Sequence, residues 1–157
     1  MKKTTWQSYV FWIVITEAVG ALAGLLIRDD VPVYGAVINK PPLSPPGTVF
    51  PVVWAVLYAL MGFGAARIFS AAPSPQRDRG RRLYLLQLVF NFFWSLLFFH
   101  LRAFGVALAW LAALWGLILW MILTWRKVDR TAALLQIPYL LWVSFAGYLN
   151  AGVWALN

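Results

Sequence analysis

The stretch FGVALAWLAALWGLILWMILTW, residues 104–125, contains no charged side chain and is long enough to cross a lipid bilayer. A membrane-spanning helix needs about 20 predominantly apolar residues, because each residue advances only about 1.5 Å along the helix axis. The strands of a membrane β-barrel are shorter and alternate between apolar and polar residues, whereas this stretch is continuously apolar. The stretch therefore predicts a transmembrane helix.

Four other apolar runs of similar length accompany this one along the chain. They cover residues 9–27, 49–69, 83–101 and 132–156. Of the 157 residues, 62% are hydrophobic and only 11% are charged, and the mean hydropathy is +0.75. A soluble protein of this composition would expose too much apolar surface to water. We expect an all-α bundle of five transmembrane helices that forms a single integral membrane domain over residues 1–157.

The connections between the runs differ in length and character. Residues 28–47 form the only long one, and their KPPLSPPG segment (40–47) cannot continue a helix, because proline removes a backbone donor and restricts the preceding residue. We expect an ordered, extended loop there, followed by Thr48 as the N-cap of the second helix. Residues 71–82 are polar and predict a flexible connection, whereas residues 102–103 allow only a tight antiparallel hairpin.

The net charge of +8 comes from short basic clusters between the apolar runs. Ten of the thirteen Lys and Arg residues fall on one side of the predicted bundle, namely Lys2, Lys3, Arg67, Arg77, Arg79, Arg81, Arg82, Arg126, Lys127 and Arg130. The other side holds Arg28, Lys40 and Arg102. Because basic residues concentrate in cytoplasmic loops, we expect the N-terminus inside. Nucleic acid is not an expected partner, since no soluble face collects the charge.

Few residues are suited to acid–base, nucleophilic or metal chemistry. The chain has no Cys, one His and five acidic residues, which predicts neither a catalytic constellation nor a metal site. Glu17 is the only acidic residue within a predicted span. We interpret it as a neutral or hydrogen-bonded group that helps helices to pack, rather than as a proton-transfer site. His100, near Arg102, is expected to have a structural role at the membrane interface.

Three predicted helices carry polar and aromatic side chains at helical spacing on one face. These residues are Trp54, Tyr58 and Met61 in the second helix, Gln87, Asn91, Trp94 and Ser95 in the third, and Tyr139, Trp142, Ala146 and Asn150 in the fifth. Pro138 is expected to kink the fifth helix near this face. The three faces are typical of a pocket for a flat apolar ligand with a few polar anchors. They suit simple packing of the bundle core equally well.

Two further patterns concern helix packing. Gly20 and Gly24 in the first helix, and Gly62 and Ala66 in the second, are small-residue pairs that allow helices to approach closely. Four tryptophans recur every five residues in the fourth helix, at Trp110, Trp115, Trp120 and Trp125. This spacing turns each ring by about 140° from the previous one, so the four cannot share one face, and some must point toward lipid or another subunit.

Several of these residues together resemble the tryptophan-rich sensory protein family, also called the translocator protein or peripheral benzodiazepine receptor family. The matching motifs are Lys40-Pro41, Pro45-Pro46-Gly47, Phe50-Pro51, Trp54, Tyr58, Phe90-Asn91, Trp94, Pro138-Tyr139, Trp142, Phe145-Ala146, Leu149-Asn150 and Trp154. Their order, their spacing and the five-helix layout agree over essentially the whole chain.

The resemblance implies a five-helix homodimer that binds porphyrins, such as protoporphyrin IX and haem, beneath the loop between helices one and two. It implies no obligatory cofactor, and its expected partners are porphyrin-type small molecules and membrane lipid. In animal members it also implies binding of cholesterol and of synthetic benzodiazepine-like ligands. Carried over to matching positions, the resemblance assigns the ligand site to Tyr34, Pro46, Trp54, Tyr58, Asn91, Trp94, Trp142 and Ala146.

Two departures from the family pattern narrow these expectations. Val33 and Leu43 stand where the family loop commonly has Trp, and no basic residue follows Asn150, as the proposed cholesterol motif requires. We therefore expect no cholesterol binding, which fits a bacterial member in the cytoplasmic membrane. A porphyrin receptor or sensor ranks first among the functions, and a light- or oxygen-dependent porphyrin-degrading enzyme ranks second. A transporter ranks third, because the chain lacks repeated halves.

Overall fold

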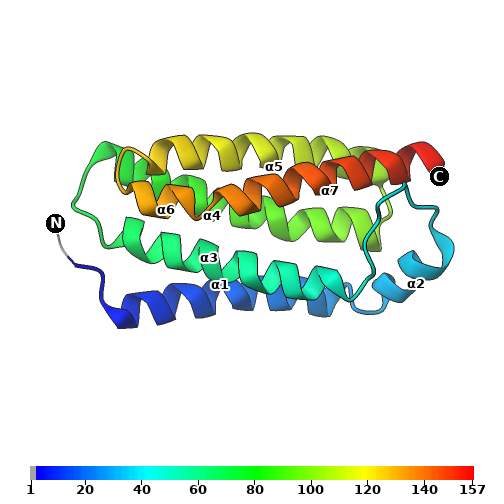
Figure 1. Cartoon of the computed structure of the whole chain (residues 1–157), viewed down its shortest axis with the longest axis horizontal. Coiled ribbons are helices and arrows are strands. Elements are labelled where there is room, and N and C mark those ends of the chain that lie inside the picture. Colours follow the sequence, from blue (N-terminus) through cyan, green and yellow to red (C-terminus); the bar gives the residue numbers. More distant parts are fainter. Residues whose placement is uncertain (1–2) are drawn as a thin grey trace.

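The computed structural model describes residues 3–157, and every regular element within them is helical (Figure 1). Five segments are long and apolar enough to cross a membrane: Trp6–Leu26, Val49–Phe69, Pro75–His100, Phe104–Trp125 and Arg130–Leu156. The predicted all-α bundle of five membrane-spanning helices is therefore confirmed. Lys2, which was counted with the cytoplasmic charges, lies outside the described residues.

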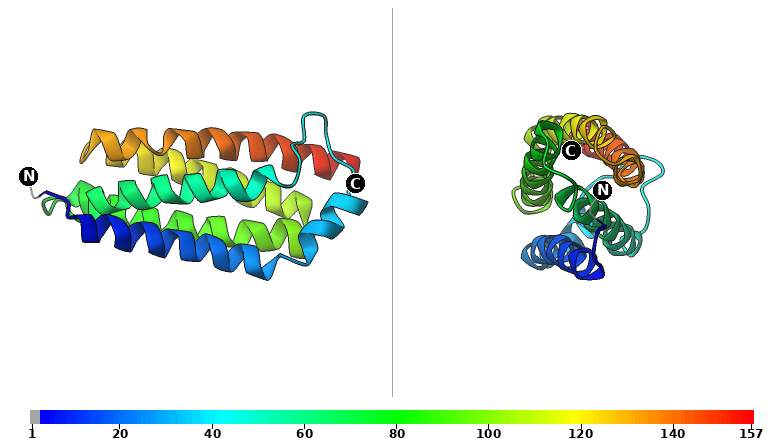
Figure 2. Two further views of the ribbon diagram at one scale, coloured as in Figure 1. Left: turned by 60° about the horizontal axis from the view of Figure 1, so that its bottom comes forward. Right: turned by 90° about the vertical axis from the view of Figure 1, so that its left-hand side faces the viewer.

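The segments divide into elements that run along one elongated bundle. These are α1 (Trp6–Leu26), α2 (Asp30–Val37), α3 (Val49–Phe69), α4 (Pro75–Ser95) with its π-helical continuation η1 (Leu96–His100), α5 (Phe104–Trp125), α6 (Arg130–Leu134) and α7 (Ile137–Leu156). α1 packs against α3, α4 against α5, and α5 against α7. The C-terminus lies at the end of the bundle that carries α2, opposite the end at which α1 begins (Figures 1 and 2).

The first connection contains a helix, which corrects the prediction of an extended loop over residues 28–47. The carboxylate of Asp30 lies in the first turn of α2, where negative charge is favourable, and Pro32 occupies the same turn without losing a helical hydrogen bond. Asp30 Oδ2 also lies 3.0 Å from Nδ1 of His100, so α2 is tied to η1. Residues 28–29 form a turn before α2, and the proline-rich remainder, residues 38–47, lacks a helix.

The start of α4 differs from the sequence prediction, and the start of α3 agrees with it but lacks the predicted capping bond. α4 begins at Pro75, earlier than expected, because the Arg77 N–H donates to the Oγ of Ser74 at 3.0 Å and Pro75 suits a first turn. The prediction of a flexible connection over residues 71–82 is therefore wrong beyond Ser74. Thr48 occupies the N-cap position of α3, as predicted, but its side chain makes no capping hydrogen bond.

The fifth span consists of two helices rather than one kinked helix. α6 ends at Leu134 and α7 begins at Ile137, so Pro138 lies in the first turn of α7, where a missing N–H is harmless. Gln136 occupies the break, and its Nε2 donates to the backbone carbonyl of Leu60 on α3 at 3.2 Å. The break between α6 and α7 is thereby fixed against α3.

Glycines bring α1 and α3 into contact along one half of the bundle. A Cβ added to Gly62 would lie 2.5 Å from the Cα of Ile13, so the two helix backbones touch there. A Cβ added to Gly20 would overlap the ring of Tyr58. The predicted close approach at Gly20 and Gly62 is thus confirmed, whereas a Cβ on Gly24 would meet no atom within 4 Å.

The tryptophans of α5 point in different directions, as their spacing predicts. Trp125 is fully buried, and its Nε1 donates to the backbone carbonyl of Gly80 on α4 at 3.0 Å. Trp120, in contrast, is 52% exposed on the outer surface of the bundle. The four rings therefore serve both the core and the surface that meets lipid.

Candidate ligand site

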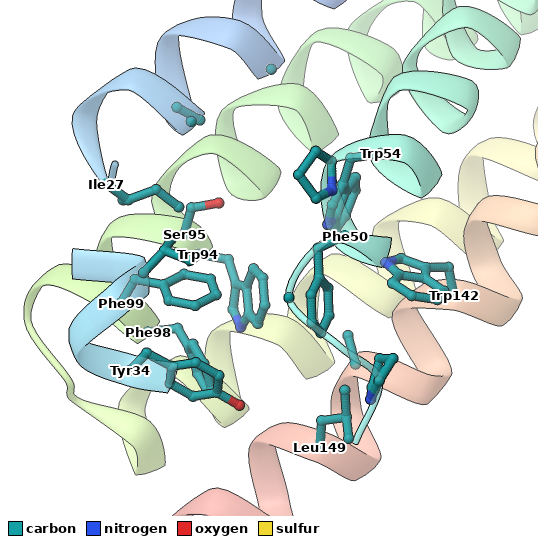
Figure 3. A pocket seen from close by; sticks show the side chains of 18 of the residues that line it. Ile27, Tyr34, Phe50, Trp54, Trp94, Ser95, Phe98, Phe99, Trp142 and Leu149 are labelled. Atoms are coloured by element: carbon teal, nitrogen blue, oxygen red, sulfur yellow. The ribbon is translucent and has the colours of Figure 1, made fainter. Parts of the chain in front are cut away.

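A cavity of about 470 Å³ lies at the end of the bundle that carries α2 (Figure 3). Its walls come from α1, α2, α3, the end of α4, η1 and α7, and the proline-rich loop between α2 and α3 borders it. Small-molecule sites in proteins occupy roughly 300–1,000 Å³. The cavity is therefore large enough for a ligand of several fused or linked rings.

Aromatic rings form much of the cavity wall. Those labelled in Figure 3 are Phe50 and Trp54 of α3, Trp142 of α7, Trp94 of α4, Tyr34 of α2, and Phe98 and Phe99 of η1. Trp54 stacks on Tyr58 with ring centroids 5.4 Å apart, and Trp94 stacks on Phe98 at 5.2 Å. Walls of this kind favour a flat, apolar ligand through apolar burial and aromatic contact.

Two ionisable residues of opposite charge line the cavity. Lys40 is the only base in the part of the lining that the structure describes, and the Lys40 Nζ donates to the backbone carbonyl of Gly35 at 3.0 Å, near the C-terminal end of α2, where the helix dipole favours a cation. Glu17 is the only acid among the described lining residues. Among residues 3–157, Glu17 has no hydrogen-bonded partner, so of the two forms considered for a packing group, hydrogen-bonded or neutral, only the neutral one agrees with the structure.

Tyr34 adds a neutral polar group to the cavity wall. Its ring lies 5.3 Å from the Lys40 Nζ, and its hydroxyl points into the cavity in Figure 3. Burial raises the pKa of the Tyr34 phenol, because the charged form loses solvation. The phenol therefore stays protonated at neutral pH and can donate a hydrogen bond.

A buried chain of hydrogen bonds begins at the cavity wall and crosses the core. The Tyr58 hydroxyl donates to Asn91 Oδ1 at 2.8 Å, and Asn91 Nδ2 donates to the Tyr139 hydroxyl at 2.7 Å. Tyr139 in turn donates to Gln87 Oε1 at 2.7 Å. The chain joins α3, α4 and α7, and it satisfies polar side chains that would be costly if left unpaired in a membrane-buried core.

Six of the eight residues predicted for the site line the cavity. They are Tyr34, Trp54, Tyr58, Trp94, Trp142 and Ala146. Asn91 does not line it, because both atoms of its amide are engaged behind Tyr58 in the hydrogen-bond chain. Pro46 is exposed and outside the lining, although its neighbours Pro45 and Gly47 belong to it.

Many of the lining residues were not assigned from the sequence, among them aromatic residues of η1 and small residues of α1. Phe98 continues the three-and-four spacing of Trp94, so the pattern on the third predicted helix contained a signal for it. Phe99 joins the wall within the π-helical turn, whose wider register the spacing of an α-helix does not anticipate. On α1, Ala21 and Gly24 also line the cavity, but such small residues carry no chemical signal.

The likeness to known proteins extends over almost the whole chain. The sequence profile of the TspO/MBR family matches residues 12–155. The chain belongs to the TspO/MBR family. The tryptophan-rich protein TspO of Chlorobaculum tepidum is 33% identical over 141 residues, which is 89% of each chain. The translocator protein of Bos taurus is 32% identical over 154 residues, 97% of this chain and 91% of its own.

A third relative of this TspO/MBR protein is the tryptophan-rich sensory protein of Cereibacter sphaeroides, 32% identical over 153 residues, 96% of this chain and 94% of its own. The resemblance drawn from the motifs is therefore confirmed. Family membership and the five spanning helices together establish an integral, multi-pass membrane protein.

Proposed function

We propose that this TspO/MBR protein is a membrane receptor or sensor that binds a porphyrin in the cavity. The observation that carries the proposal is a cavity of about 470 Å³ bordered by the indole rings of Trp54, Trp94 and Trp142. A flat macrocycle placed there gains apolar burial and aromatic contact. The names of two relatives, sensory protein and translocator protein, support a role in sensing or moving a ligand.

The donor set of the cavity favours a metal-free porphyrin over haem. Haem iron is usually held by His, Cys, Met or Tyr, and the described lining supplies only the tyrosines of this group, Tyr34 and Tyr58. Tyr58 already donates its proton to Asn91. Lys40 is the cation available to the carboxylates of a porphyrin at the loop side of the cavity. Protoporphyrin IX is therefore the ligand we propose first.

Replacing Trp142 by alanine is expected to weaken protoporphyrin IX binding roughly two- to tenfold, because one aromatic contact with the macrocycle is lost. The measurement is a titration of the purified protein in detergent and in the dark, followed by porphyrin absorbance. Trp120→Ala is the matched control, since Trp120 lies on the outer surface of α5 and should leave the affinity unchanged. Equal affinities for both variants and the wild type would contradict the proposal.

The same titration carried out under light tests the second candidate function. Trp54, Trp94 and Trp142 border the cavity, so a photo-excited porphyrin bound there would lie beside oxidisable indoles. Light-dependent loss of porphyrin absorbance that disappears in Trp142→Ala, and persists in Trp120→Ala, would favour a degrading enzyme over a receptor. Stable absorbance under light supports binding alone.

We further propose that the N-terminus and the connection before α4 face the cytoplasm of a bacterial cell, because most basic residues lie at that end. The chain has no Cys, so single introduced cysteines report topology cleanly. An impermeant thiol reagent added outside intact cells should label Thr48→Cys, which is exposed at the opposite end, and should spare the exposed Gln76→Cys. Labelling of Gln76→Cys alone would invert the proposed topology.

A further inference from the structure

We propose that the cavity opens sideways into the lipid bilayer between α1 and α3, and that its ligand enters from the membrane by this route. We call this opening the portal, and its walls are Ala21 and Gly24 of α1 and Pro51 and Ala55 of α3. The inference rests on the proposed function, because it concerns how the ligand of this cavity arrives.

The two helices that flank the portal touch at one end and separate at the other. α1 and α3 are antiparallel, with backbone contact at Gly62 and a ring packed against Gly20. One helical turn beyond Gly20, at Gly24, a Cβ would meet no atom within 4 Å. α1 and α3 therefore separate at the height of the cavity, which residues of both helices line.

The residues that form the walls of the portal face both the cavity and the outside of the bundle. Ala21, Gly24, Pro51 and Ala55 all line the cavity, and all four are also exposed. Since α1 and α3 are membrane-spanning helices, their exposed surface meets acyl chains rather than water. None of the four side chains is charged or bulky, so a flat apolar molecule can pass edge-on between them.

Entry from the aqueous end would instead have to displace an anchored loop. The Tyr148 hydroxyl of α7 donates to the backbone carbonyl of Pro42 at 2.7 Å. The Asn39 N–H donates to Asn157 Oδ1 at 3.1 Å, and Asn157 Nδ2 donates back to the Asn39 carbonyl at 2.8 Å. These bonds hold the loop on α7 and would break if the loop lifted, whereas passage through the portal breaks none of them.

The portal predicts a kinetic signature that a change in the binding surface does not produce. An obstruction in an entry route slows entry and exit by the same factor, so the equilibrium affinity is preserved. A lost or added contact with the bound ligand, in contrast, changes mainly the dissociation rate. Leucine at Gly24 or at Ala55 places a bulky side chain in the portal from either wall. Slower association in both variants then distinguishes entry through the portal from entry past the loop.

The experiment uses the full chain in lipid nanodiscs, with protoporphyrin IX supplied in the same bilayer. Association is followed through quenching of tryptophan fluorescence, and dissociation through transfer to empty acceptor vesicles. Gly24→Leu and Ala55→Leu should each slow association about tenfold, and the association rate is the deciding readout because both residues also line the cavity. Gly116→Leu on α5 is the control, because its position is exposed and a Cβ there also meets nothing within 4 Å.

Unchanged association rates in both portal variants would overturn the portal, whatever happens to Kd. If association became faster in Tyr148→Phe, which frees the loop, the loop would be the entry route and the portal would also fall. Failure of the wild type to bind protoporphyrin IX at all would overturn the proposed function, and the portal with it. Normal binding with unaffected rates rejects the portal alone.

A second measurement avoids the bulky substitutions. In this Cys-free chain, a single Ala55→Cys should react with a lipid-soluble maleimide, and bound protoporphyrin IX should protect it, because the position faces both lipid and cavity. Gly116→Cys should react to the same extent with and without porphyrin. An Ala55→Cys that does not react, or that porphyrin does not protect, would contradict an open portal.

Discussion

Gly62→Leu should lower the Tm of the detergent-solubilised protein by roughly 10 °C, because forcing a side chain between two touching backbones costs about 3 kcal/mol. A Cβ at this position already lies 2.5 Å from the Cα and 2.7 Å from the backbone nitrogen of Ile13. Backbone atoms cannot rotate away as a flexible side chain can, so α1 would have to move off α3. Thermal unfolding followed by circular dichroism measures the effect.

The matched control is Gly116→Leu, the same substitution on α5, where the added side chain meets no neighbour. Its Tm should equal or slightly exceed that of the wild type, because leucine favours helix more than glycine does. If Gly62→Leu and Gly116→Leu unfolded at the same temperature, the contact between α1 and α3 would not contribute to stability as described.

Ala146→Leu should weaken protoporphyrin IX binding by about ten- to a hundredfold, since overfilling a packed site costs about 1–3 kcal/mol. Ala146 is 7% exposed and lies on the cavity wall one helical turn beyond Trp142. The added carbons would occupy space that a bound macrocycle needs. A titration in the dark, with folding confirmed by circular dichroism, gives the affinity.

Ala112→Leu on α5 is the control for this variant, because Ala112 is exposed on the outer surface of the bundle. It should bind protoporphyrin IX like the wild type. Wild-type affinity in a folded Ala146→Leu variant would show that the porphyrin does not occupy this cavity, and the aromatic walls would then be bundle core.

Most of the fold follows from the sequence because a membrane permits few alternatives. A continuous apolar run must satisfy its backbone internally, so it forms a helix, and the bounds of α3 and α5 agree with the apolar runs that predicted them. The errors lie in polar segments at the bundle ends. There, capping by Ser74 and Asp129 decides where α4 and α6 begin, and hydropathy does not register such local bonds.

The site was predictable where its residues have chemical character. Trp54, Trp94 and Trp142 each lie on a helical face that also carries other polar or aromatic residues, and all three line the cavity. Asn91 has the same spacing, but the sequence does not tell whether an amide faces a ligand or another side chain, and here it bonds two tyrosines. The portal was not predicted, because it is defined by side chains that are small.

The hydrogen-bond chain behind Tyr58 affects which ligands suit the cavity and how they would be oriented in it. Every donor points the same way, from Tyr58 through Asn91 to Tyr139, so the Tyr58 proton is already committed. A ligand with an acceptor at this edge could accept a hydrogen bond from Tyr58 only if Asn91 Oδ1 lost its own, which costs about 1–3 kcal/mol. We therefore expect the deep edge of the cavity to disfavour oxygen-rich ligands, so that an amphiphilic ligand would place its carboxylates toward Lys40.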